Sequence, residues 1–260
     1  MIAKTDLIEG MVKGMAVLES FDTERQRLNA TLAAQKAGIT RAAARRHLLT
    51  LAHLGYLESD GRYFWLSSKV LRFSGSYLAS ARLPRVLQPT LERLAAQTQA
   101  AFSAVVLNGD EVVIVARSGN IRHGGVEEVP QLLAYGLHLG ARLPAHATST
   151  GRVLLAAMPK AAFSEWLKLR QLTRLTVHTI TAAPQLRRVI DQVRRDDYCL
   201  SSEEHELGVH ALAVPLRNLQ GQTVAALNVV ASTARCPPET MLRDLLPLML
   251  EAARELRLIL

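Results

Sequence analysis

The stretch from Arg25 to Leu57 contains six Lys or Arg residues and no Asp or Glu. Residues 32–51 within it read as a helix, a turn centred on Gly38 and a second helix. Gly38 can take the positive φ that ends the first helix, and Thr40 can cap the second by accepting a hydrogen bond from a free backbone N–H. Two short helices joined by a tight turn, the second of them basic, are typical of a helix-turn-helix that binds the major groove of DNA.

The second predicted helix has one apolar and one basic face. Ala44, Leu48 and Leu51 recur at i, i+4 and i+7, which predicts the buried face. On the other face Arg41 and Arg45 are expected to contact base edges, while neighbouring side chains hold phosphates. The predicted DNA contacts of this part are Lys36, Thr40, Arg41, Ala42, Arg45 and Arg46. A merely solvated row of arginines is the alternative, which the turn and the missing acids disfavour.

A short hairpin is predicted directly after this helix. Residues 55–66 read as two strands around a turn at Asp60 and Gly61. Arg62 and Tyr63 follow the tip, where the wing of a winged helix-turn-helix reaches a phosphate or the minor groove. We therefore add both residues to the predicted DNA contacts, with a plain surface hairpin as the alternative.

The charge of the chain is unevenly distributed. Its 260 residues leave room for about two domains. Residues 1–82 hold 12 Lys or Arg against 7 acids, whereas the longer remainder holds 19 against 16. This asymmetry is expected when one domain contacts a polyanion and the other does something else.

No membrane or metal partner is indicated. The chain lacks an apolar run of about 18 residues, and its start lacks the features of a secretory signal, so a cytoplasmic location is expected. Cys199 and Cys236 have no paired spacing and are expected to be buried, reduced thiols. His205 and His210 are five residues apart with Gly208 between them, which excludes a shared helical face for a metal. Glu203 and Glu204 beside them are expected to form a solvated loop.

The remainder of the chain predicts a mixed α and β domain. A helical pattern over residues 67–82 reads as a linker helix, followed by a helix at 85–99 with Pro84 in its first turn. Strand pairs are predicted at 102–107 with 111–116 and at 211–216 with 223–230, and a last helix at 239–260 is interrupted by Pro247. The fold class is thus α+β, with a winged helix-turn-helix domain at 1–66, a linker helix at 67–82 and a second domain with an antiparallel sheet at 83–260.

One segment of the second domain has the features of an anion site. Residues 148–151, Thr-Ser-Thr-Gly, precede a predicted helix at 152–158, whose free N–H groups and positive dipole end could receive a carboxylate. Plain helix capping is the alternative. Tyr135, Leu143 and Val209 could contact a ring or belong to the core. Nucleophile-elbow, P-loop and dinucleotide motifs are absent from the sequence, so we predict no catalytic residue and no cofactor.

Residues 136–156, 202–215 and 225–229, together with the winged helix, resemble the IclR family of bacterial transcriptional regulators. The resemblance covers nearly the whole chain. Residues 82–94, 143–145 and 148–156 are most similar to the branch of that family that contains the PcaR, PcaU and PobR regulators of aromatic-acid breakdown. Two places depart from the family: residues 118–130 are longer than usual, and His47 stands where the recognition helix is normally apolar.

The resemblance implies a dimer, often paired into a tetramer, that controls a catabolic operon. It would bind a palindromic double-stranded DNA operator through the winged helices and an organic acid through a GAF-like effector-binding and oligomerisation domain. Protocatechuate, 4-hydroxybenzoate and β-ketoadipate are the expected kinds of effector, and an activator would also contact RNA polymerase. The implied effector contacts are Leu132, Tyr135, Leu143, Ser149, Thr150, Ser201, Val209, Ala211, Asn228 and Val230. The next candidates for holding the carboxylate are Arg142 and His146.

Two other functions stay open at this point. The second domain of an architectural DNA-binding protein would only oligomerise, and an enzyme with an accessory DNA-binding domain would convert its ligand. Turnover separates an enzyme from a sensor. Stabilisation by ligand separates a sensor from an architectural protein, because a ligand at about 100 times its dissociation constant adds roughly 2.7 kcal/mol to the folded state.

Overall fold

The computed structural model describes residues 3–22, 25–118 and 138–260. These residues form two compact units, Met1–Ser80 and Ala81–Leu260. The helix predicted as a linker belongs to the first unit in this division. The sequence-based boundaries at 66 and 82 stay predictions.

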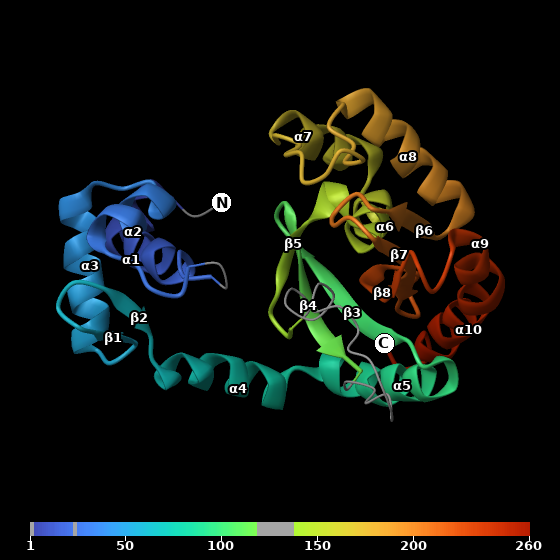
Figure 1. Ribbon diagram of the computed structural model, residues 1–260, viewed down its shortest axis with the longest axis horizontal. Coiled ribbons are helices and arrows are strands. Elements are labelled where there is room, and N and C mark those ends of the chain that lie inside the picture. Colours follow the sequence, from blue (N-terminus) through green and yellow to red (C-terminus); the bar gives the residue numbers. More distant parts are fainter. Residues whose placement is uncertain (1–2, 23–24, 119–137) are drawn as a thin grey trace. The chain divides into compact units, whose positions relative to one another are not determined.

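The first unit contains the predicted helix-turn-helix and wing (Figure 1). Its elements are η1 (Lys4–Asp6), α1 (Glu9–Glu19), α2 (Ala30–Ala37), α3 (Arg41–His53), β1 (Leu57–Ser59), β2 (Phe64–Leu66), η2 (Ser68–Val70) and α4 (Leu71–Ser80). Gly38 ends α2 at φ +64°, and the Thr40 hydroxyl accepts the Ala43 N–H at the start of α3. Both caps are as predicted, so the angle between the two helices is set by local chemistry.

A small core holds this unit together. Val17, Leu28 and Leu48 are fully buried, and the strands contribute Leu57 and Phe64. Leu48 comes from the face of α3 that was predicted to be buried. The opposite face of α3 is therefore left for solvent or a partner.

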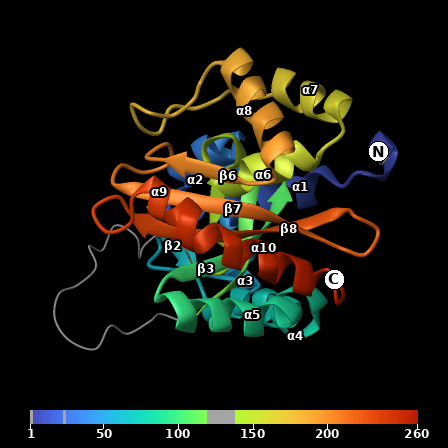
Figure 2. The same ribbon diagram turned by 90° about the vertical axis from the view of Figure 1, so that its right-hand side faces the viewer.

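The second unit is built on one antiparallel sheet with the strand order β5-β4-β3-β8-β7-β6. Figure 2 labels β3, β8, β7 and β6 of this sheet. The strands are β3 (Ala101–Asn108), β4 (Glu111–Arg117), β5 (Arg142–Pro144), β6 (Cys199–Ser202), β7 (Val209–Arg217) and β8 (Thr223–Ser232). Both predicted hairpins are present, the first closed by Gly109 and Asp110. The predicted mixed α and β domain with an antiparallel sheet is thus confirmed.

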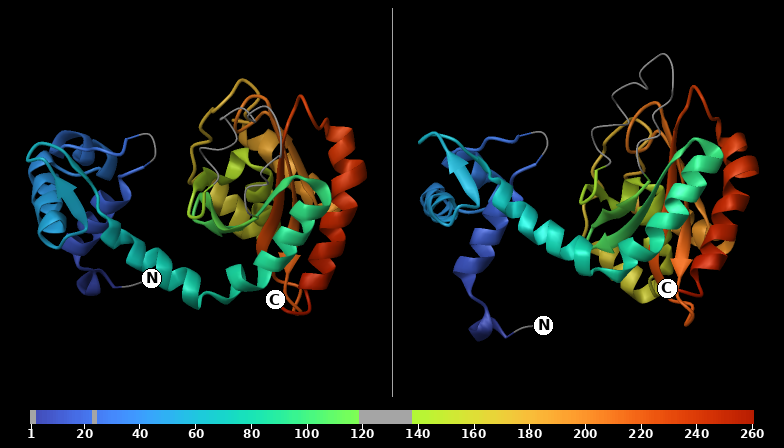
Figure 3. Two further views of the ribbon diagram at one scale, coloured as in Figure 1. Left: turned by 60° about the horizontal axis from the view of Figure 1, so that its bottom comes forward. Right: turned by 90° about the horizontal axis from the view of Figure 1, so that it is seen from below.

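Helices cover both faces of the sheet. On one face α5 (Arg82–Thr98) lies beside α10 (Leu246–Leu256), as Figure 3 shows, and Leu87, Leu91 and Leu94 of α5 are buried there as predicted. On the other face lie η4 (Ala145–Ala147), α6 (Ser149–Ala157), α7 (Lys160–Lys168) and α8 (Ala183–Asp196). The sheet side chains alternate between these two cores, because successive residues of a strand point to opposite faces.

Two predicted helix starts were wrong. The helix α5 begins at Arg82, three residues before the predicted start. The helix α6 begins at Ser149, so the hydroxyls of Ser149 and Thr150 lie in its first turn and Thr148 is the cap. The last helix is interrupted before Pro247, as predicted: the chain passes from α9 (Pro238–Thr240) through a π-helical turn, η5 (Met241–Leu245), into α10, which has Pro247 in its first turn. The wider turn accommodates a residue that cannot donate a backbone hydrogen bond.

Candidate functional site

The exposed face of α3 carries the predicted base contacts. Arg41, Ala42, Arg45 and Arg46 are all exposed, whereas Ala44 on the other side is fully buried. Within the described part of the chain none of the three arginines forms an ion pair. Their guanidinium groups are therefore available for phosphates and base edges.

Two other predicted DNA contacts have partners inside the unit. The Lys36 ammonium forms an ion pair with Asp22, which compensates part of its charge. The Thr40 hydroxyl is used as the cap of α3, at 3.3 Å from the Ala43 nitrogen. A hydroxyl can accept one hydrogen bond and still donate its own proton, so Thr40 retains a donor for a phosphate.

The wing tip is held by Asp60. Its Oδ1 accepts the backbone N–H groups of Arg62 at 3.0 Å and Tyr63 at 2.7 Å, and these two bonds lower the pKa of the carboxyl. Its Oδ2 lies 2.6 Å from the guanidinium of Arg27, which sits 4.4 Å above the ring of Trp65. Arg27 was missed by sequence reasoning, since it precedes α2 and only the fold brings it to the wing.

Most of the predicted effector contacts share the sheet face that α6 covers. Paired residues of antiparallel strands point to the same side. Ser201, Ala211 and Val230 form one row across β6, β7 and β8. Asn228 lies in the next row together with Ser103 on β3 and Ala213 on β7, and Ala213 belongs to the core beneath α6.

The first turn of α6 meets this face through polar side chains. Ser149 donates to the Asn228 Oδ1 at 3.4 Å, and the Asn228 amide donates to the Ser103 hydroxyl at 3.3 Å. All three are buried. Thr150 is buried beside them and has no side-chain hydrogen bond to any described residue. Long bonds and an unused hydroxyl leave hydrogen-bonding capacity for a ligand. Ser103 was missed, although a Ser within an apolar strand was a signal.

Leu143 and Val209 share this sheet face but lie outside the polar cluster of Ser103, Ser149, Thr150 and Asn228. Leu143 lies on the edge strand β5, separated from β8 by two strands or about 14 Å, and packs into the core beneath α6. Val209 lies at the start of β7 opposite Ser232. Leu132 and Tyr135 lie outside the described residues.

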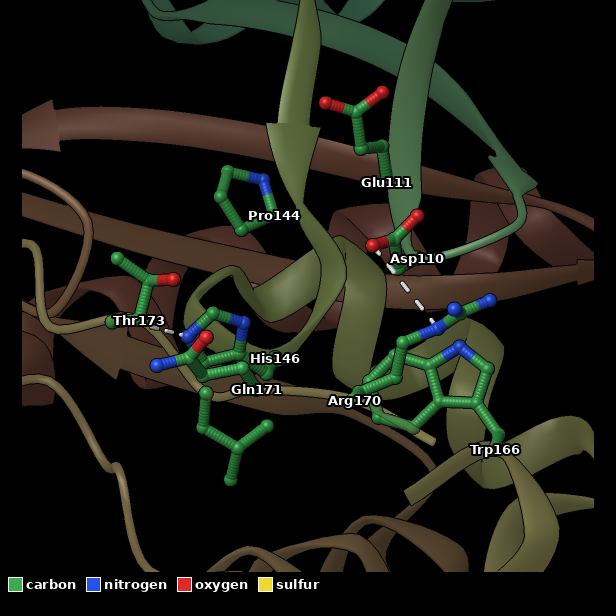
Figure 4. Close-up of a pocket in the computed structure, with 9 residues that line it drawn as sticks. Asp110, Glu111, Pro144, His146, Trp166, Arg170, Gln171 and Thr173 are labelled. Atoms are coloured by element: carbon green, nitrogen blue, oxygen red, sulfur yellow. Dashed lines mark hydrogen bonds and ion pairs between the residues drawn. The ribbon is translucent and has the colours of Figure 1, made fainter. Parts of the chain in front are cut away.

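Arg142 and His146, the next candidates for binding the effector carboxylate, do not lie at the polar cluster. Arg142 is exposed, with its Nε 3.5 Å from Glu111. The ring Nε2 of His146 lies 2.9 Å from the Thr173 carbonyl, and burial lowers the pKa of this histidine. His146 instead lines a small open pocket at the tip of the β3–β4 hairpin, between Pro144, Trp166 and Arg170 (Figure 4). This pocket is far from the polar cluster, because Ser103 lies six residues before Gly109 at the hairpin tip, which is about 20 Å along the strand.

A buried ion pair stands where a solvated acidic loop was expected, and that expectation was wrong for Glu204. Arg152 is 1% exposed and Glu204 is 9% exposed. Both guanidinium Nη atoms lie 2.5 Å from the Glu204 carboxylate oxygens, and the Arg152 Nε donates to the His146 carbonyl at 2.9 Å. The signal for Arg152 was that it is the single charged residue of α6. No sequence signal distinguished Glu204 from Glu203.

The cysteines and other polar groups add no further chemistry. Burial raises the pKa of Cys199 to about 11, while Cys236 is only half-buried, contrary to expectation. In the described ranges no three His, Cys, Asp or Glu residues are grouped so that they could hold a metal ion. Across those same ranges, helices are too short or too polar to cross a membrane.

Comparison with known families accounts for both units. Residues 11–61 match the IclR helix-turn-helix domain, and residues 75–258 match the family described as bacterial transcriptional regulator IclR C-terminal. The two matches together cover most of the chain.

Several relatives are similar over the whole chain or the second unit. The Pca operon regulatory protein of Acinetobacter baylyi is 52% identical over 259 residues, which is 100% of this chain and 91% of the relative. The p-hydroxybenzoate hydroxylase transcriptional activator of the same organism is 51% identical, covering 98% and 93%. The solved inducer-binding domain of the PobR transcription factor from Acinetobacter, a double mutant in complex with 3-hydroxybenzoic acid, has a TM-score of 0.63 and 48% identity, covering 69% of this chain and 100% of that domain. The chain with the helix-turn-helix and the six-stranded domain described above therefore belongs to the IclR family of bacterial transcriptional regulators.

Proposed function

We propose that this protein is a transcriptional regulator of a catabolic operon that responds to an aromatic acid. The observation that carries the proposal is the buried polar cluster of Ser149, Thr150, Asn228 and Ser103, which lies in a unit 48% identical to a domain solved with a hydroxybenzoic acid. An architectural or purely oligomerising domain has no need of buried hydroxyls with unused hydrogen-bonding capacity, because burying polar groups costs free energy.

The DNA-binding part of the proposal rests on α3 and the wing. Arg41 and Arg45 would contact base edges, and Thr40, Arg46 and Arg62 would hold phosphates. The three arginines of α3 are exposed and without ion pairs in the described chain, and Asp60 holds the wing loop in one conformation. Replacing Arg41 with Ala should cost about 1 to 3 kcal/mol of operator affinity and relax base preference at one position.

The effector would place its carboxylate at the first turn of α6. Ser149 and Thr150 supply hydroxyls there, and the dipole of the helix favours a negative charge. The ring would lie against Ala211 and Val209, and a distal hydroxyl would meet Ser201 or Asn228. Hydroxybenzoates such as 4-hydroxybenzoate and protocatechuate fit this description.

We also propose that the protein is a homo-oligomer. Ile8 at the N-cap of α1 and Met11, Val12 and Met15 within α1 recur at helical spacing, and their exposed fractions range from 49% to 68%. The helix α4 has no buried residue although it carries Leu71, Phe73 and Tyr77. Such stripes are typical of helices that pack against a second copy. A two-fold dimer would match a palindromic operator.

The proposed function includes a location, a fate of the ligand and, for an activator, a further partner. The protein acts in the cytoplasm, where a regulator of this family meets DNA. It is a sensor that returns its ligand unchanged, not an enzyme. An activating role would add a contact with RNA polymerase.

Unfolding measured with a panel of organic acids tests the sensor proposal. We expect hydroxybenzoates at about 100 times their dissociation constant to raise the free energy of unfolding by roughly 2.7 kcal/mol and to change operator affinity. No stabilisation by any acid of the panel would favour the architectural protein instead. Chromatography of the acid after incubation provides the control, because a new product would indicate an enzyme.

A further inference from the structure

The Arg152–Glu204 ion pair joins the two halves of the proposed effector site. Arg152 lies on α6 three residues after Ser149, on the same side of the helix. Glu204 follows the end of β6 and lies three residues after Ser201. The pair is closed by two bonds of 2.5 Å and is buried at both ends.

Each member of the pair is also tied to a further segment. Arg152 Nε donates to the His146 carbonyl, which fixes the guanidinium against η4. The Glu204 carboxylate accepts the Ile180 N–H at 3.2 Å, and its backbone carbonyl accepts the Thr179 hydroxyl at 2.7 Å. The start of α6, the segment around 176–180 and the loop after β6 therefore meet at one ion pair.

This geometry constrains distances that a ligand would depend on. An arginine fork bound to both oxygens of a carboxylate permits one relative position and orientation of the two groups. Arg152 lies within one helical turn of Ser149, and Glu204 lies three residues after Ser201, just past the end of β6. The position of the ion pair therefore sets the gap between the two serine hydroxyls. Neither member of the pair is exposed, so neither serves as a surface charge.

We propose that Arg152 and Glu204 are positioning residues of the effector site. They hold the Ser149 and Thr150 turn of α6 at a fixed distance from Ser201 and the adjoining β7, without contacting the effector themselves. The proposal rests on the proposed function, since it assigns the pair to the site at which an aromatic acid would bind.

Glu204→Gln is the main test variant, because it keeps the size of the side chain and removes its charge. Asp197→Asn is the matched control. Asp197 forms a two-bond pair of similar length with Arg217 in the same unit, at 2.5 and 2.6 Å, so it controls for the loss of a paired carboxylate. This pair is partly exposed, joins the end of β7 to the turn after α8 and touches no proposed effector contact. Both variants are made in the full chain, and the ligand probe is 4-hydroxybenzoate.

Calorimetry should show that Glu204→Gln weakens 4-hydroxybenzoate binding by about tenfold, whereas Asp197→Asn leaves it within about twofold. The double variant Arg152→Met with Glu204→Met separates positioning from stability. Apolar replacement of a buried ion pair restores stability in many proteins but does not restore the fork geometry. We therefore expect a folded double variant that still binds weakly, and full affinity in it would overturn the proposal.

Amide hydrogen exchange without any ligand makes the result independent of the proposed function. Glu204→Gln should speed exchange both at 149–153 and at 201–209, and Asp197→Asn at neither. Unchanged exchange at both segments would overturn the positioning role even if no acid bound the wild type. Absence of binding by the wild type, with faster exchange in Glu204→Gln, would instead contradict the proposed effector while supporting the role of the pair in holding the two segments together.

Discussion

Adding a single methyl group at Gly151 should strongly destabilise the second unit. A Cβ at this residue would lie 2.1 Å from the carbonyl oxygen of Ala145 and 2.3 Å from its Cα. Both are backbone atoms of η4, so no side chain can rotate away. Replacing Gly151 with Ala therefore requires η4 and the first turn of α6 to separate by about 1 Å before ordinary contact distances return.

The size of the effect follows from what α6 buries. Val153, Leu154 and Leu155 of α6 are only 0–6% exposed. A gap of 0.5 to 1 Å forfeits roughly a quarter to a half of the dispersion energy of the contacts it opens. Overpacking a core typically costs about 1 to 3 kcal/mol. The cost at Gly151 should lie at the upper end of this range or above it, because the added Cβ meets backbone atoms and α6 is packed on two sides. We expect Gly151→Ala to lower the free energy of unfolding by about 3 kcal/mol or more.

Urea denaturation followed by circular dichroism measures this loss. With an m-value of about 2 kcal/mol/M, the midpoint should fall by about 1.5 M. Gly75→Ala is the matched control, because Gly75 lies within α4 with nothing within 4 Å of its added Cβ. That variant should stabilise its helix by about 0.5 to 1 kcal/mol. A wild-type midpoint for Gly151→Ala would refute the close approach of α6 and η4.

Four further outcomes are expected. Thr150→Val should weaken hydroxybenzoate binding by about 0.5 to 1.5 kcal/mol in calorimetry, with ligand-free operator affinity retained; unchanged affinity would move the carboxylate elsewhere. Arg62→Ala should lower the salt dependence of operator binding by about one unit for all sequences, and a loss confined to one sequence would contradict a phosphate contact. Met11→Lys should yield monomers in light scattering, whereas persistent dimers would exclude the α1 stripe as an interface. Burial lowers the pKa values of His146 and His205 below 6.5 in the folded chain, so protons bind the unfolded state preferentially and the free energy of unfolding should fall as the pH drops below 6.5. Urea titrations of a variant with both His146→Gln and His205→Gln should show a free energy of unfolding that depends less on pH. The same pH dependence in this variant and the wild type would contradict burial of these histidines as the cause.

The first unit could be predicted closely because its chemistry is local. Gly38, Thr40 and Asp60 each act on backbone within a few residues of themselves, through a positive φ, a cap and a turn. The apolar spacing of α3 then decides which face is buried and leaves its arginines exposed. The hairpins of the second unit were predictable for the same reason, since Asn108, Gly109 and Asp110 form a tight turn whatever surrounds them.

The site in the second unit depends on pairings between distant segments, which local patterns do not contain. Strand order places Asn228 beside Ser103, 125 residues apart in sequence, and keeps Leu143 away from both. Burial of Glu204 depends on Arg152 arriving from α6, because a carboxylate is stable in the interior only when a partner compensates its desolvation. The sequence by itself therefore determined the DNA-binding unit and the kinds of residue that a ligand would meet. Only the tertiary structure decided which of those residues share one face and which charged pair holds them there.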